Sequence, residues 1–392
     1  MDKLLQEEII SIYKAWDSLE RQLYGNEIID FCAIKVESKH RFTARTHVIK
    51  ALENVDEMLP SGEPEFEFIQ KRIQASIYYL NACLGERIPF ESYILGTMGV
   101  SPRLFPEEKV QKSFDAAQEL LASLGIDFSR EFHTEYEKRC LIVDRSSVKE
   151  QTEAQVKKWL SRLGRYIKVP TMEDVVITFV TEDAYWANWI SGSIDNGVEI
   201  KINLHNRIKY LHGSPSMLAV HEYCGHLVQG TQWSLNAKSG LLDAACAFTT
   251  VHGPETFVME GLSDSLAYIL VNDDSELDFN ETLARCLIRH RNIVNNNVHY
   301  LINTGLGFRE VFDYYSKYLP FDDILRIESS IRDKSNDPLG RTYQYVYGIA
   351  QDYFLSIPNF AIKEKKCLLS ELYSKPYTKS QLDQLVLNLA SG

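Results

Sequence analysis

Residues 216–230 read SMLAVHEYCGHLVQG, a largely apolar stretch that carries two histidines and a glutamate and is typical of a helix. In the common HExxH zinc motif, the two histidines lie four residues apart and share one helix face. Here His221 and His226 are five apart, which separates them by about 140° on an ideal α-helix. One extra residue absorbed as a π-bulge would return both to one face, and Gly225 suits such a distorted backbone. The stretch therefore predicts a metal-binding helix of unusual pitch.

A second acidic segment, VMEGLSDSLAY, follows 34 residues after His226 and places Glu260 and Asp264 four apart on another predicted helix. Glu260 would complete a His/His/Glu ligand set and leave a fourth position for water. Glu222 would act as general base on that water, and Asp264 would accept the free ring N–H of a ligating histidine. The set predicts a Zn²⁺ site, although other divalent ions also bind such donors. The alternative is that these residues are ordinary polar groups on two helices.

Two later segments are rich in hydrogen-bond donors. RNIVNNNVH (residues 291–299) would place Arg291 and His299 on one helix face, and GRTYQYVYG (residues 340–348) contains Arg341 and three tyrosines. Amide hydrolysis produces an oxyanion, which a Tyr or His donor stabilises. The sequence by itself does not choose among Tyr343, Tyr345 and Tyr347.

The 392 residues carry 42 Lys and Arg against 54 Asp and Glu, a net charge of −12. Nucleic-acid binding requires clustered basic residues, so we expect no nucleic-acid partner. We also expect no membrane association and a cytoplasmic location, because the N-terminus does not resemble a signal peptide and no long apolar run occurs. The seven scattered cysteines include no CxxC pair and do not suggest a disulfide framework.

Helical periodicity predicts a mostly α fold, with a small β-sheet next to the metal helix. Residues 1–168 form a helical N-terminal region and 169–392 a catalytic region, which we expect to make one continuous globular unit. Residues 174–186 and VEIKINLH (residues 198–205) have the composition of strands. The second strand would lie either at the sheet edge beside the metal helix or in the sheet interior.

Two motifs resemble those of the gluzincins, zinc metallopeptidases with HExxH on one helix and a Glu ligand on the next. EGLSD looks like the ExxSD segment of thermolysin-like enzymes, and HEYCGH looks like the HExxGH helix of dipeptidyl peptidase III. The resemblance implies a gluzincin-like core. It also implies that an edge strand beside the zinc helix pairs with an extended substrate.

A wider resemblance is to the bacterial domain of unknown function 885 family, which is largely helical. Its pattern of HExxPGHxxQ, an EG-containing helix, RxxxDxxxH and GxxxxYxxG is echoed in order between Met217 and about Leu355. The chain departs from it in the shorter histidine spacing and in Asn295, where the family has Asp. The resemblance favours His299 and Tyr345 as catalytic oxyanion donors. It leaves Arg341, Arg291 and Tyr347 as candidates for binding substrate.

The leading hypothesis is a zinc-dependent hydrolase of an amide bond, most simply a metallopeptidase acting on a small peptide. A second hypothesis keeps the zinc site but gives it a non-peptide biosynthetic intermediate as substrate. A third is a catalytically inactive helical protein on a peptidase scaffold. The sequence leaves cleavage mode and oligomeric state open.

Overall fold

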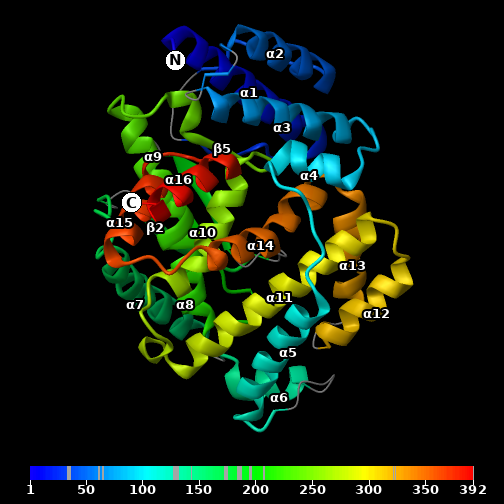
Figure 1. The fold of residues 1–392 in the computed structure, drawn as a ribbon, viewed down its shortest axis with the longest axis vertical. Coiled ribbons are helices and arrows are strands. Elements are labelled where there is room, and N and C mark those ends of the chain that lie inside the picture. The colour runs from blue at the N-terminus through cyan, green and yellow to red at the C-terminus, as the bar shows by residue number, and fades with distance from the viewer. Residues whose placement is uncertain are drawn as a thin grey trace.

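The computed structural model describes residues 1–32, 37–60, 62–63, 66–126, 132–142, 144–171, 175–182, 188–193, 197–205, 208–320, 322 and 324–391. Helices make up most of it, so the predicted mostly α fold is confirmed (Figure 1). The α-helices are α1 (Lys3–Tyr24), α2 (Arg45–Met58), α3 (Glu67–Cys83), α4 (Phe90–Met98), α5 (Glu107–Ala122), α6 (Phe132–Cys140), α7 (Arg145–Leu163), α8 (Ser214–Leu218), α9 (Val228–Lys238), α10 (Glu255–Ile269), α11 (Phe279–Asn303), α12 (Phe308–Tyr318), α13 (Ile324–Asn336), α14 (Pro338–Ser356), α15 (Ile362–Ser374) and α16 (Lys379–Ser391).

The remaining elements are short. A π-helix, η1, spans Ala219–Leu227, and two 3-10 helices are η2 (Ala244–Cys246) and η3 (Asp274–Glu276). The strands are β1 (Ile29–Cys32), β2 (Val175–Val180), β3 (Asn188–Ser193), β4 (Gly197–Asn203) and β5 (Phe248–Thr250).

The strands form two small sheets. β2, β4 and β3 form one sheet in that order, with β2 parallel and β3 antiparallel to β4. The strand VEIKINLH is β4, so of the two positions that the sequence leaves open, the sheet interior is the one observed. β2 and β3 are the two edge strands, and the sequence does not predict a strand over Asn188–Ser193. Residues 183–187 and 194–196, within or beside the predicted strands, lie outside the described residues.

The helix that carries the two histidines runs through the middle of the main core. α8, η1 and α9 follow one another without a break, with α7 and α10 packed on η1 and α14 packed on α10. Figure 1 shows α10 near the centre of the molecule, with α14 beside it. Trp159 of α7, Leu227 of η1, Leu266 of α10 and Val346 of α14 are all buried in this core. Apolar packing on both sides therefore holds the helix in place.

Polar contacts anchor the start of this helix. The Ser216 hydroxyl in α8 donates to a carboxylate oxygen of Glu281 at 2.6 Å and accepts from the Trp159 indole N–H at 2.8 Å. Glu281 also forms a capping box with Asp278 at the N-terminus of α11. Segments from α7, α8 and α11 thus meet at one buried carboxylate, which sets the direction in which the helix enters the core.

The main core also crosses the boundary expected near residue 168. Phe31 of β1, Phe90 of α4 and Trp159 of α7 belong to the same buried cluster as the helices that follow residue 213. β1 pairs with β5, which joins the N-terminal region directly to the later one. Among the described helices, none has the length and apolar composition needed to cross a membrane.

Shortening Leu266 to Ala tests the packing that positions the metal helix. Leu266 is fully buried on α10, whereas Leu325 on α13 is 77% exposed. We expect Leu266→Ala to lower the free energy of unfolding by about 2–5 kcal/mol, because it removes buried apolar contacts and leaves a cavity. The matched Leu325→Ala should change it by less than about 0.5 kcal/mol. Urea denaturation measures both, and equal losses would contradict this account of the core.

Candidate metal centre

The π-helix brings the two histidines together despite their five-residue spacing. η1 extends over the whole HEYCGH motif, and its i→i+5 hydrogen bonding winds residues five apart onto one face. The Nε2 atoms of His221 and His226 lie 3.1 Å apart, and their rings meet edge to face at a centroid distance of 4.8 Å. The predicted π distortion is therefore confirmed, and it is a π-helix of nine residues.

Gly225 serves this site in a different way from the one expected. Its φ is not positive, so its backbone does not require glycine. A Cβ built on Gly225 would lie 2.2 Å from the Ser263 hydroxyl oxygen and 2.7 Å from the Ser263 Cβ. Glycine therefore allows α10 to approach η1 closely. That approach carries Glu260, also on α10, to the histidines.

Glu260 completes the set of three donors that the sequence predicted. Its Oε2 atom lies 3.4 Å from Nε2 of His221 and 3.4 Å from Nε2 of His226. Ligand atoms bound tetrahedrally at zinc distances of 2.0–2.1 Å are separated by roughly 3.3 Å, close to the spacing seen here. The same Oε2 is buried and has no hydrogen-bond partner among the described residues. The three residues therefore fit a divalent cation bound between them.

Glu222 also lies close to the histidines. Its carboxylate is within 4.8 Å of both imidazoles, and its Oε1 is 3.8 Å from Nε2 of His221. Glu260 is the better third ligand, because it is nearer and equidistant from both rings. Glu222 is therefore free to act on a water molecule beside the cation, as expected for a general base.

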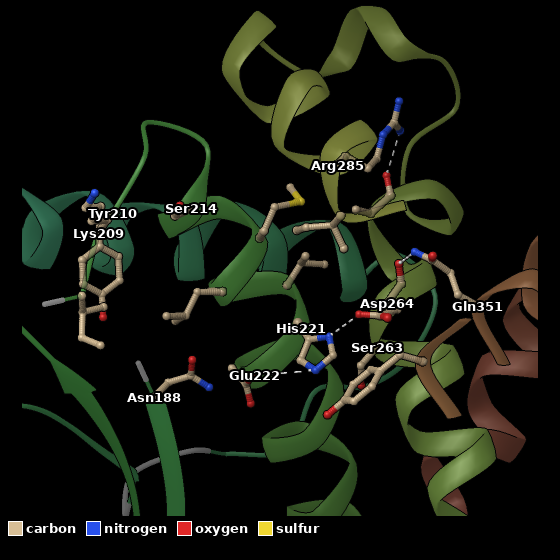
Figure 2. Close-up of a pocket in the computed structure, with 17 residues that line it drawn as sticks. Asn188, Lys209, Tyr210, Ser214, His221, Glu222, Ser263, Asp264, Arg285 and Gln351 are labelled. Atoms are coloured by element: carbon tan, nitrogen blue, oxygen red, sulfur yellow. Dashed lines mark hydrogen bonds and ion pairs between the residues drawn. The ribbon is translucent and has the colours of Figure 1, made fainter. Parts of the chain in front are cut away.

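A second layer of hydrogen bonds orients the donors. Asp264 Oδ1 lies 2.8 Å from Nδ1 of His221, which leaves Nε2 of that ring as the ligating atom (Figure 2). The Asn292 amide donates to the other Asp264 oxygen at 2.8 Å. The Tyr343 hydroxyl donates to Oε1 of Glu260 at 2.7 Å, so that Oε2 faces the histidines. The predicted role of Asp264 agrees with this geometry.

The electrostatics of the cluster also favour a cation. Burial alone would lower the pKa of His221, but nearby carboxylates, led by Glu222, outweigh it and raise that pKa well above its usual value. The pKa of His226 is raised against burial as well, chiefly by Glu260. Burial would raise the pKa of Glu260, yet the two histidines hold it well below its usual range. The carboxylates outnumber the imidazoles, and a divalent ion would balance them.

The donor cluster opens into a cavity with two lobes. We call the first the α11 lobe, which has a volume of about 410 Å³ and is lined in part by Lys209 and by Arg285 of α11. The second, the β1 lobe, has about 370 Å³ and is lined in part by Asp30 and by Thr249 of β5. The two lobes share the side chains Asn188, His221, Glu222 and Tyr347. Figure 2 shows Asn188, on the edge strand β3, beside Glu222, which lies between it and His221 in this view. A substrate could thus extend to either side of Glu222.

The structure does not bring His299 and Tyr345 to this cavity. His299 is fully buried in α11, where its ring stacks on Phe90 at a centroid distance of 5.5 Å. Burial, together with Lys334 and Arg341, lowers its pKa well below the usual value. The Tyr345 hydroxyl accepts from the backbone N–H of Arg103 at 2.8 Å, on another face of α14. Neither side chain lines a lobe of the cavity.

The two arginines proposed for substrate binding are also engaged elsewhere. Arg291 makes a bidentate ion pair with Asp322, with contacts of 2.6 and 3.0 Å. Arg341 donates to the Asn303 side chain at 3.0 Å and to the backbone oxygen of Ile88 at 3.2 Å. Neither arginine lines the cavity. Tyr347, the remaining substrate-binding candidate, does line both lobes.

The sequence does not predict the role of Tyr343, and it does not indicate Asn188 or Asp30 at all. Tyr343 is one of three candidate catalytic tyrosines in the sequence, but in the structure it orients Glu260. Its spacing from Tyr347, four residues on one helix, could have indicated that the two share a face. No sequence motif marks Asn188 or Asp30 as site residues, because each lies in a short strand far from the HEYCGH motif in sequence.

Comparison with known proteins identifies a similar fold. No family model matches the chain, and a search of curated proteins finds no match. Among solved structures, the chain is similar to the crystal structure of "the putative lipoprotein from Colwellia psychrerythraea", with a TM-score of 0.60 and 15% identity. The match covers 88% of this chain and 67% of the other. At this identity, the likeness shows a shared fold and nothing of activity.

Replacing Asp264 by Asn tests whether the contact between Asp264 and His221 strengthens zinc binding. Asn removes the charge that fixes the His221 tautomer, so we expect zinc affinity to fall about 10- to 100-fold. Competition with a chromophoric chelator measures the affinity. Asp115, exposed on α5, is the matched control, and Asp115→Asn should bind zinc as the unaltered protein does. An unchanged affinity in Asp264→Asn would contradict the assigned geometry.

Proposed function

We propose that this protein is a metal-dependent hydrolase that cleaves an amide bond, most simply that of a small peptide, with zinc as the ion. The observation that carries the proposal is the spacing of three donor atoms, 3.1 to 3.4 Å apart, beside a cavity that Glu222 also lines. This combination supplies a ligand set, an open side and a base, and it supports a catalytic site because structural zinc sites are closed by a fourth protein ligand.

A divalent ion held by His221, His226 and Glu260 would supply Lewis acidity at the scissile carbonyl and make water more acidic. Glu222 takes the proton of the attacking water, because it borders both lobes and lies next to the ligands. It then returns that proton to the departing amine. Asp264 keeps the His221 ring in one tautomer throughout.

Tyr347 is the donor best placed for the oxyanion. It lines both lobes and packs edge to face against Tyr343 at a centroid distance of 5.6 Å. Burial and the carboxylate of Glu260 raise the pKa of Tyr347 well above its usual value, so its hydroxyl stays protonated. A protonated hydroxyl at the cavity wall can donate to a developing negative charge on oxygen. Tyr347 therefore replaces Tyr345 in this role.

Glu222→Gln tests the proposal directly. We expect the variant to bind zinc as the unaltered protein does and to lose kcat by about 10²- to 10⁴-fold, because Gln cannot accept the proton. Elemental analysis measures the metal, and mass spectrometry of a library of di- and tripeptides measures turnover. If Glu222→Gln cleaves peptides at the unaltered rate, the proposed mechanism is wrong. If the unaltered, zinc-loaded protein cleaves none of them, peptide hydrolysis itself is excluded.

Two substitutions on α14 separate an oxyanion donor from a packing residue. Tyr347→Phe should lower kcat about 10²- to 10³-fold with little change in KM, since the hydroxyl acts mainly in the transition state. Tyr345→Phe, the matched control, should keep kcat and lose about 1 kcal/mol of stability, because its hydroxyl bonds to the Arg103 backbone. Steady-state kinetics and urea denaturation distinguish the two. A loss of kcat confined to Tyr345→Phe would reverse the assignment.

A further inference from the structure

β1 enters the site with a local irregularity at Asp30. In its antiparallel pairing with β5, Ile29 is opposite Thr250 and Phe31 is opposite Thr249, so Asp30 has no counterpart. Such a β-bulge leaves one residue outside the ladder and changes the direction of its side chain, and bulges are frequent beside active sites. Ile29 and Phe31 are both buried, whereas Asp30 is exposed and lines the β1 lobe. The bulge thus directs one carboxylate into the cavity.

This carboxylate is available to a ligand. Across the part of the chain that the structure describes, no hydrogen bond or ion pair engages the Asp30 side chain. The side chain is open to the cavity but lies deep in the protein, and this burial raises its pKa to about 6, with His226 opposing and Glu260 adding to the rise. The carboxylate is therefore the main form at neutral pH. Asp30 lines the same lobe as His226 and Glu260, two of the three candidate metal ligands.

The two lobes differ in charge. The α11 lobe includes Lys209 and Arg285 in its wall, which balance the carboxylates of Glu222 and Asp264 that also line it. The described lining of the β1 lobe contains Asp30, Glu222 and Glu260 and neither Lys nor Arg. With a divalent ion balanced by Glu222 and Glu260, Asp30 leaves this lobe with a negative charge. A positively charged substrate group is stabilised there by Coulomb attraction at short range.

We infer that Asp30 binds the free amino group of the substrate, which makes the protein selective for amides of unblocked amino acids and for the N-terminal bond of small peptides. This inference rests on the proposed hydrolase function. The α-ammonium group is two covalent bonds from the carbonyl carbon that is attacked, so it must lie close to the metal ligands. Asp30 meets this requirement in that it lines the same lobe as His221, His226 and Glu260. A lysine or arginine side chain would place its charge farther from the scissile bond.

Turnover of matched substrates tests this selectivity. The unaltered, zinc-loaded protein should cleave a di- and tripeptide library with free N-termini in preference to the same library N-acetylated. In Asp30→Asn, KM for the free peptides should rise about 10- to 100-fold, while kcat and the cleavage of acetylated peptides stay nearly unchanged. Equal rates on both libraries, or equal losses on both in the variant, would overturn the role of Asp30.

A binding measurement separates this role from the proposed hydrolysis. Leucine hydroxamate and N-acetyl-leucine hydroxamate both present a metal-binding group, and only the first has a free amine. Calorimetry on the zinc-loaded protein should show tighter binding of the free amine, and Asp30→Asn should abolish the difference. If that holds while no peptide is cleaved, the amine site stands and the proposed hydrolysis fails. If neither hydroxamate binds more tightly, the amine site is excluded, whatever the turnover.

A matched variant controls for the charge change. Glu27 precedes β1, lines neither lobe and pairs with Arg21 at the surface. Glu27→Gln removes the same charge near Asp30 and should leave the preference for the free amine intact. A loss of preference in Glu27→Gln equal to that in Asp30→Asn would show that the general field, not contact with Asp30, sets selectivity.

Discussion

The site depends on the winding of residues 219–227 as a π-helix. Histidines five apart diverge on an α-helix, and only i→i+5 pairing aligns their ring nitrogens at 3.1 Å. π-Helices are rare, so this segment needs support from its surroundings. α7 and α10 pack on either side of it, and Gly225 lets Ser263 approach to a distance that no side chain at position 225 would allow. Tertiary packing therefore stabilises the one backbone geometry in which the ligands converge.

The buried charge of Glu260 is the second constraint. The Glu260 carboxylate is buried with its Oε1 bonded to Tyr343, while Oε2 faces two imidazoles without a hydrogen bond. A buried charge is costly unless it is paired. The proposed cation would pair it and would also account for the carboxylates that surround the histidines. Binding of that ion would then be linked to the stability of the surrounding core.

The sequence does not predict which tyrosines of α14 reach the cavity. Tyr343 and Tyr347 are four residues apart and share a helix face, whereas Tyr345 lies about 200° around the helix from Tyr343. With tyrosines at every second position, the segment itself does not show which face meets α10. The packing of α14 on α10 turned Tyr343 and Tyr347 to the cavity and Tyr345 to the backbone of Arg103. The packing of α11 in the core likewise decides that His299 stacks on Phe90 and does not reach the cavity.

The sequence by itself predicted the mostly helical fold and indicated His221, His226 and Glu260, with Glu222 and Asp264, as one candidate site. These predictions rest on residue types and short spacings, which local backbone periodicity converts into geometry within each helix. The packing of α10 on η1 then brought the two helices' residues together. Only the tertiary structure decided that β4 is the central strand of its sheet, that Tyr347 rather than Tyr345 reaches the cavity, and that Asp30 lines the same lobe as His226 and Glu260. Asp30 and Glu260 are 230 residues apart. No local sequence pattern predicts that these two residues line one lobe, because their proximity results from the packing of distant segments into one core.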